Sequence, residues 1–196
     1  MPPEMVRTMV GYDPDVAKSR AEARKIMAGL GYGPDKRLKV KVSTRDIPVY
    51  RDPAVILIDQ LKEIFISAEF DVVETSVWFG KVARKDYAIG LNLTGNAVDD
   101  PDQTFYENYA CTSERNYTQY CNKDLEKLFD QSPETDLEQR KHRVWEIDHK
   151  LQDDVVQPII YHNRAATCWQ PVVHGFTPMV NSSYNGDRFE DLWLDR

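Results

Sequence analysis

The sequence predicts an α/β fold with a mixed, mainly parallel sheet flanked by helices. Half-buried strands alternate apolar with polar or small residues, and this pattern occurs at 38–44 and 87–93; residues 70–77 are interpreted as another strand. A helical pattern separates the first two of these segments, and strand–helix–strand at this spacing is a βαβ unit with parallel strands. The 196 residues, 41% of them hydrophobic, are enough to bury a real core.

Two Asp-Pro pairs mark predicted helix starts in the first half of the chain. Asp13-Pro14 begins the first helix, because Asp is a good N-cap and Pro suits the first helical turn. Asp52-Pro53 repeats this signal and begins the helix between the first two strands. We expect a further short helix over 79–84, before the third strand.

The third strand and the polar loop after it organise our functional hypothesis. Ligands of open α/β sheets bind at the carboxyl ends of the strands, where this loop lies. Asn96, Asp99 and Asp100 are therefore candidate ligand-binding residues. Each also has a local alternative: Asp100, directly before Pro101, is a natural helix N-cap, Asp99 is a solvated loop residue, and Asn96 is a turn residue.

The ends of the first two strands supply three more candidate ligand-binding residues. Arg45 and Tyr50 follow the first strand, on the side where a ligand is expected. Trp78 ends the predicted second strand, where its ring can stack on a ligand. The alternatives are a surface position for Arg45 and burial in the core for Trp78.

The second half of the chain predicts helices followed by short strands. Asn122 caps a short helix, and the longest helix runs over 136–154. Two short strands are expected over 158–162 and 166–169. From Gly175 the chain is rich in the turn-forming residues Gly, Asn, Ser and Pro. It ends in an apolar stretch with no evident partner.

The spacing of the three cysteines does not decide whether the chain contains a disulfide. Cys111 and Cys121 lie ten residues apart, a spacing that fits no common zinc site but allows either two free thiols or a disulfide. A disulfide here implies an oxidising compartment. Cys168 is interpreted as a small buried apolar residue. The sequence predicts no metal site and no cofactor.

Charge and hydropathy exclude several classes of partner. The net charge is −7 and the isoelectric point is near 5.1, and no long basic run exists, which disfavours nucleic acid and anionic membranes. No apolar stretch approaches the length of a membrane span. The first residues lack the apolar core of an export signal, so we expect either a cytosolic protein or a piece of a longer one.

Several motifs, in order along nearly the whole chain, resemble one family. It is the dipeptide/oligopeptide/nickel class of ABC-transporter solute-binding proteins, bacterial extracellular solute-binding protein family 5. The motifs that carry the resemblance are Tyr12-Asp13-Pro14 with Leu30-Gly31-Tyr32, Ile58-Asp59-Gln60-Leu61-Lys62, Asp100-Pro101, the loop from Asn116-Tyr117 to Tyr120-Cys121-Asn122, and Arg140 with Ile160-Tyr161.

The resemblance implies one lobe of a type II periplasmic-binding-protein-like fold, similar to the C-terminal portion of longer family members. It implies a ligand-binding lobe over 1–175 and a segment, 176–196, that returns to the missing N-terminal lobe. The implied protein is periplasmic, binds a small-molecule or peptide ligand, and acts with the membrane subunits of an ABC importer. It is not an enzyme. One departure disfavours ordinary free-amine peptides: Ala97 stands where peptide-binding members carry the Asp that receives the peptide ammonium.

Two hypotheses of different classes follow. In the first, the chain is part of a solute-binding protein that closes around a peptide-like or related polar solute by a hinge motion. In the second, it is a self-contained α/β metal-dependent hydrolase that uses Asp99 and Asp100 as acid, base or metal ligands.

Overall fold

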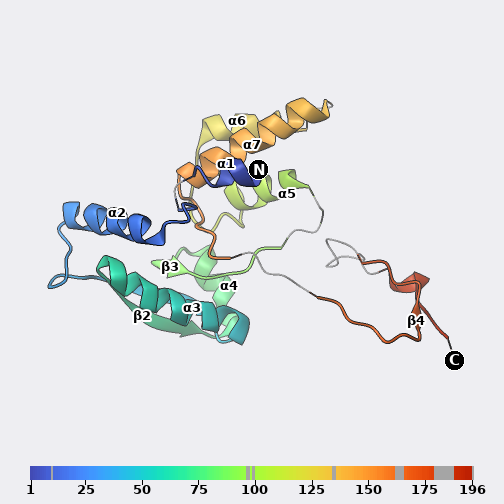
Figure 1. The fold of residues 1–196 in the computed structure, drawn as a ribbon, viewed down its shortest axis with the longest axis horizontal. Coiled ribbons are helices and arrows are strands. Elements are labelled where there is room, and N and C mark those ends of the chain that lie inside the picture. Colours follow the sequence, from blue (N-terminus) through green and yellow to red (C-terminus); the bar gives the residue numbers. More distant parts are fainter. Residues whose placement is uncertain are drawn as a thin grey trace. The chain divides into compact units, whose positions relative to one another are not determined.

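The structure, a computed structural model, describes residues 1–9, 11–95, 98, 100–133, 136–161, 166–178 and 188–195. The chain divides into two compact units (Figure 1). The first unit comprises Met1–Thr94 with Tyr117–Gln119, and the second comprises Gly95–Asn116 with Tyr120–Arg196. Neither contains a described helix that is both long enough and apolar enough to cross a membrane.

A three-stranded parallel sheet forms the centre of the first unit. Strand β1 (Leu38–Arg45) lies between β2 (Ile66–Val73) and β3 (Ile89–Gly90), and both neighbours run parallel to it. The register places Leu38 opposite Ile66 and Arg45 opposite Val73. The predicted α/β class and the parallel pairing of the first two strands are therefore confirmed.

Five short or medium helices accompany this sheet. They are α1 (Pro3–Val6), α2 (Val16–Gly29), α3 (Pro48–Leu61), the 3-10 turn η1 (Lys62–Ile64) and α4 (Thr75–Ala83). Helix α3 packs along one face of the sheet, where Val42 and Ala54 are fully buried (Figure 1). Side chains alternate between the two faces of a strand, so Val73 points to the other face, where it packs against Trp78 and Val82 of α4.

Helix α3 begins earlier than the Asp52-Pro53 signal predicted. Helix α3 starts at Pro48, which takes the first helical position directly after the extended Ile47, and Pro53 lies inside the helix. In α2 the N-cap is Asp15, whose side chain accepts the backbone N–H of Lys18, and not the expected Asp13. Both errors arise because an Asp or Pro marks a helix start only where the preceding backbone is already extended or turning.

The predicted strand over 70–77 is displaced by four residues. Phe65 has a left-handed backbone (φ 65°) and its carbonyl accepts the N–H of Leu38, which fixes the start of β2 at the next residue. The strand is complete at Val73, and Trp78 is consequently in helix α4 and not at a strand end. The third strand is also shorter than expected, with only Ile89–Gly90 paired as β3.

The second unit is built on helices. They are α5 (Pro101–Thr104), the π-helical turn η2 (Phe105–Tyr109), α6 (Lys123–Asp130), α7 (Leu137–Asp153) and the 3-10 turn η3 (Phe189–Asp191). Helices α6 and α7 lie side by side (Figure 1) around a core of Phe105, Leu125, Phe129, Ile147 and Leu151. The predicted cap Asn122 and the predicted helix start near Asp136 are confirmed, and the side chain of each accepts two backbone N–H groups of its helix.

The strands expected over 158–162 and 166–169 are not found in their described parts, 158–161 and 166–169. The second unit instead pairs β4 (Val173–His174) antiparallel with β5 (Trp193–Leu194). The ring of His174 stacks on that of Trp193 at 4.5 Å, which is a cross-strand contact that joins residues nineteen positions apart. No local periodicity predicts such a pairing.

A disulfide joins Cys111 to Cys121, and Cys168 is a free, exposed thiol. The bridge resolves the alternative that the spacing left open, whereas the expected burial of Cys168 is wrong. We expect one reactive thiol per denatured chain without reductant and three with it. Reduction should lower the free energy of unfolding by about 3 kcal/mol, because the bridge closes a ten-residue loop. Urea titration with and without reductant measures this loss, and unchanged stability would contradict it.

Candidate functional site

Four residues meet at the carboxyl edge of the sheet in the first unit, and we call them the Arg45 cluster: Arg45, Tyr50, Phe79 and Asn92. The guanidinium carbon of Arg45 lies 4.0 Å from the ring centroid of Tyr50 and 5.3 Å from that of Phe79. Its Nη2 donates to Oδ1 of Asn92 at 3.1 Å. The cluster therefore holds one cation against two aromatic rings.

The fold explains why these residues meet. Arg45 is the last residue of the central strand, and α3 begins three residues later, which places Tyr50 in its first turn. Phe79 comes from α4, the helix that follows β2, and Asn92 from the segment after β3. Parallel strands end at one edge of their sheet, and that edge is where α/β folds bind ligands.

Trp78 does not line this edge. Its side chain is 1% exposed and packs with Val73, Val82, Tyr87 and Tyr117. The neighbouring Phe79 is 49% exposed and supplies the ring beside Arg45. Sequence reasoning missed Phe79 because it placed 70–77 in a strand. The spacing of the two buried residues Trp78 and Val82, one helical turn apart, was the signal for a helix.

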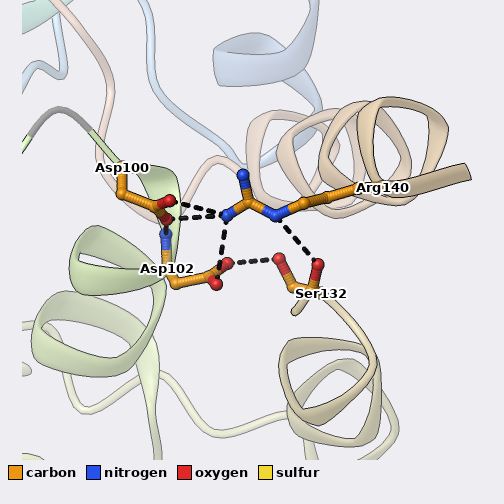
Figure 2. A network of polar contacts seen from close by, with 4 residues as sticks. All are labelled: Asp100, Asp102, Ser132 and Arg140. Atoms are coloured by element: carbon orange, nitrogen blue, oxygen red, sulfur yellow. Dashed lines mark hydrogen bonds and ion pairs between the residues drawn. The ribbon is translucent and has the colours of Figure 1, made fainter. Parts of the chain in front are cut away.

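A second polar constellation lies in the second unit, and we call it the Asp100 network: Asp100, Asp102, Ser132 and Arg140 (Figure 2). Nη2 of Arg140 donates to both carboxylate oxygens of Asp100 at 2.8 Å and to Oδ2 of Asp102 at 3.2 Å. Its Nε donates to the carbonyl of Ser132 at 3.2 Å. The hydroxyl of Ser132, which is fully buried, donates to Asp102. Arg140 therefore ties α7 to the start of α5.

The network sets the charge state of Asp100. Oδ1 of Asp100 accepts the backbone N–H of Asp102 at 2.9 Å, and this cap is the main reason why the pKa of Asp100 lies below its ordinary value. The hydrogen bond and the charge of Arg140 lower that pKa further. In return, Asp100 raises the pKa of Arg140. Asp100 is thus held as a carboxylate, with both oxygens used inside this unit.

The remaining candidates divide into three groups. Arg45 and Tyr50 are brought together, Asp100 is the helix N-cap that the local alternative named, and Asn96, Ala97 and Asp99 lie outside the described residues. The contribution of each to ligand binding stays a prediction.

The hydrolase hypothesis finds no support in the described residues. No group of His, Cys, Asp and Glu side chains in the described ranges is arranged to hold a metal ion. A carboxylic acid that serves as a general acid has a raised pKa, and that of Asp100 is lowered. Asp102, Ser132 and Arg140 were not anticipated from the sequence, because the three are separated by up to 38 positions.

No family model and no curated protein sequence matches the chain. Solved structures do match. The ABC transporter substrate binding protein CtaP of Listeria monocytogenes is 26% identical, with a TM-score of 0.61 over 74% of this chain and 29% of that protein. OppA of Burkholderia pseudomallei is 16% identical, with a TM-score of 0.79 over 94% of this chain and 36% of OppA. OppA of Haemophilus influenzae, in complex with the peptide RPPGFSPFR, is 18% identical, with a TM-score of 0.77 over 95% and 37%.

The Listeria protein is described as an ABC transporter substrate binding protein, and the Haemophilus protein is seen in complex with a peptide. The chain spans between 29% and 37% of the lengths of these three proteins. The two OppA likenesses establish the fold over almost the whole chain, and the Listeria protein adds likeness in sequence over three quarters of it. The chain thus has the fold of ABC-transporter substrate-binding proteins, the class of protein that its motifs resemble.

Proposed function

We propose that the chain is the ligand-holding lobe of a periplasmic solute-binding protein, which captures a peptide-like or related polar solute and delivers it to an ABC importer. The Arg45 cluster is the observation that carries this proposal. It presents a cation and an exposed aromatic ring at the edge of a parallel sheet where ligands of such folds bind. The structural neighbours, which include an OppA in complex with a peptide, support the same function.

Capture works by hinge closure. A ligand that contacts two lobes stabilises the closed state relative to the open one by the difference in its contacts. In this proposal Arg45, Tyr50, Asn96 and Asp99 contact the ligand. Phe79 replaces Trp78 as the exposed apolar wall, while Asp100 and Arg140 hold the start of α5, which follows the loop. Binding without turnover needs neither a cofactor nor a metal.

The domain boundaries are part of the proposal. Residues 1–175 form the ligand-binding lobe, and 176–196 return to the other lobe. Two observations support a further partner for this last segment: its described side chains Phe189, Trp193 and Leu194 are more than half exposed, and the chain covers only 36% and 37% of the two OppA proteins.

Calorimetry tests the proposal on this chain and on a longer, two-lobed protein that contains it. Mass spectrometry of small molecules that co-purify with the longer protein supplies the solute to titrate. We expect the longer protein to bind it and the chain alone to bind it far more weakly, since half of the contacts are absent. Equal affinity for both proteins would contradict the two-lobe mechanism. Absence of any bound solute would contradict ligand capture.

A pair of matched variants locates the site. Tyr50→Ala in the longer protein should weaken solute binding. Tyr32→Ala should not, although its half-buried ring also contacts a cation, Lys36 at 5.9 Å. Tyr32 precedes β1 and so lies at the opposite, amino end of the sheet. If both variants lost the same amount of affinity for the solute, the carboxyl edge of the sheet would not be the binding site.

A further inference from the structure

The disulfide between Cys111 and Cys121 closes residues 111–121 into a covalent loop, which we call the disulfide ring. The two ends of the ring are tied together a second time by Asn116, which is 3% exposed. Its Nδ2 donates to the carbonyls of Ala110 at 3.0 Å and Tyr120 at 2.6 Å, the residues directly before the two cysteines. The bridge and these bonds restrict the conformations of the whole ring, so its middle residues are ordered at a reduced cost in entropy.

The middle of the ring, Tyr117–Gln119, groups with the first unit of the chain. The half-buried side chain of Tyr117 packs on the hydrophobic cluster between β2 and α4: Val73, Trp78 and Val82. The carbonyl oxygen of Tyr117 accepts a hydrogen bond from the phenol of Tyr87 at 2.6 Å. Burial raises the pKa of the Tyr87 phenol, so this group remains a donor. Tyr117 is therefore held by packing and by a hydrogen bond.

Helix α4 depends on this packing for its position. It has only nine residues, and a helix of that length is marginal in water without tertiary contacts. Its buried side chains are Trp78 and Val82. The other described members of their cluster lie within 73–87, whereas Tyr117 comes from thirty positions after Tyr87. Tyr117 thus supports α4 from outside the β2–α4 segment.

The position of α4 matters for the solute site because the helix carries Phe79. Trp78 and Phe79 are adjacent on α4, but Trp78 is 1% exposed and Phe79 is 49% exposed. The ring centroid of Phe79 lies 5.3 Å from the guanidinium carbon of Arg45. A movement of α4 that separates Trp78 from its cluster also moves Phe79, because both side chains are fixed to the same short helix.

We infer that the disulfide ring is a positioning device for the solute site: the closed ring holds Tyr117 against α4, and α4 presents Phe79 beside Arg45. Tyr117 and Tyr87 are then positioning residues, which act through Phe79 and do not contact the solute. This inference rests on the proposed function, since it concerns the same site. It makes the affinity for the solute sensitive to reduction of the bridge.

The bridge is accessible to a reductant because Cys121 is exposed. A thiolate of a dithiol attacks the S–S bond and forms a mixed disulfide, and the second thiolate of the dithiol then closes on the first. Cys111 and Cys121 gain two electrons and two protons and become thiols, while the dithiol is oxidised to a cyclic disulfide. The opened ring has more conformations to lose, so the docking of Tyr117 costs more free energy.

Nuclear magnetic resonance on the ¹⁵N-labelled chain without any solute tests the positioning step. We expect reduction by dithiothreitol to shift the backbone amide signal of Phe79 and the Nε–H signal of Arg45. Tyr87→Phe should shift the same signals by a smaller amount, because it removes the bond to Tyr117 but keeps the ring in the cluster. The backbone signals of β1 show whether each form is folded. Tyr87→Phe keeps the bridge and decides the question even where reduction unfolds the chain.

Tyr120→Phe is the matched control. Tyr120 also belongs to the disulfide ring, and its hydroxyl also donates at 2.6 Å, but to Asp154 of the second unit. This substitution should leave the signals of Phe79 and Arg45 unchanged. The inference is overturned if Tyr120→Phe shifts them as much as Tyr87→Phe does, if Tyr87→Phe shifts neither, or if reduction of a chain that stays folded shifts neither.

Solute affinity in the longer, two-lobed protein gives a second readout by calorimetry. Serine replaces both cysteines there, Cys111→Ser with Cys121→Ser, so that no other bridge is affected. The double variant should bind the solute more weakly, by no more than Phe79→Ala does. Combined with Phe79→Ala it should cause no further loss, because both changes act through the same side chain. A full additional loss would show that the ring acts by another route and would overturn the inference.

The two proposals fail separately. The shifts at Phe79 and Arg45 are measured without solute, so they do not depend on what the longer protein binds. Unchanged signals in Tyr87→Phe, together with a solute retained by the longer protein, overturn the positioning role and leave solute capture standing. A longer protein that retains no solute contradicts solute capture itself.

Discussion

Trp78→Ala is expected to destabilise the first unit by about 4 kcal/mol, the largest effect of a single substitution considered for this chain. The side chain is 1% exposed and fills the contact between β2 and α4, where it packs with Val73, Val82 and Tyr87. Its removal leaves a cavity between Val73 of β2 and Val82 of α4. Urea unfolding followed by circular dichroism measures the loss.

Two neighbouring variants separate packing from ligand contact. Phe79→Ala, one residue later and 49% exposed, should cost less than about 1 kcal/mol of stability but weaken solute binding. Trp78→Phe should cost only about 1 kcal/mol, because the lost packing is partly offset by removal of the buried indole N–H that lacks a described partner. The assignment of Trp78 to the core would be wrong if Trp78→Ala left stability intact and reduced binding alone.

Arg140→Ala should destabilise the second unit by about 2 kcal/mol. It removes charge-assisted bonds to Asp100 and Asp102 and the bond to the Ser132 carbonyl, and leaves two carboxylates facing each other. The value stays below that of a fully buried pair because the Asp100 side chain is 42% exposed and water screens its charge. Arg140→Lys should recover only part of the loss, since the single nitrogen of an ammonium cannot take the places of both Nε and Nη2 of Arg140.

The matched control is Arg143→Ala on the same helix. Arg143 forms an exposed pair with Glu146 at 3.1 Å, and its removal should cost only about 0.3 kcal/mol. Thermal unfolding of both variants measures the difference, and equal destabilisation would show that the Asp100 network contributes no more than a surface pair.

The acid sensitivity of the fold gives an independent readout of the same network. The pKa of Asp100 in the folded chain lies below its ordinary value of 3.8, so its carboxylate stabilises the fold above that pH. This contribution is lost as the pH falls through the folded-state pKa. In Arg140→Ala the pKa of Asp100 should rise, and the pH dependence of stability below about 4 should become weaker.

Much of the fold could be predicted from local sequence patterns. The alternation over 38–44 identified the central strand, and Asn122 and Asp136 identified two helix starts, because a strand period and an N-cap depend on adjacent residues. The boundaries near Pro48 and Trp78 were predicted wrongly. There the register of β2 against β1, set from Phe65 and Leu38, decided where strand ended and helix began.

The candidate site was predicted in part. Arg45 and Tyr50 were found because both follow the strand predicted over 38–44, a feature of the sequence itself. Phe79 and Asn92 were not found, because their nearness to Arg45 depends on how α4 and the segment after β3 return to the sheet. For the same reason the sequence did not show that Arg140, forty positions later, donates to the carboxylate of Asp100.

The sequence by itself determined the α/β class, the parallel order of the first strands and the resemblance to one class of binding protein, since periodicity, turn residues and ordered motifs act over short distances along the chain. Only the tertiary structure decided which charges are already paired. It neutralises Asp100 with Arg140 and leaves Arg45 against two aromatic rings without a described anion. The physical reason is that an ion pair depends on distance in space, and folding brings together side chains that no local pattern relates.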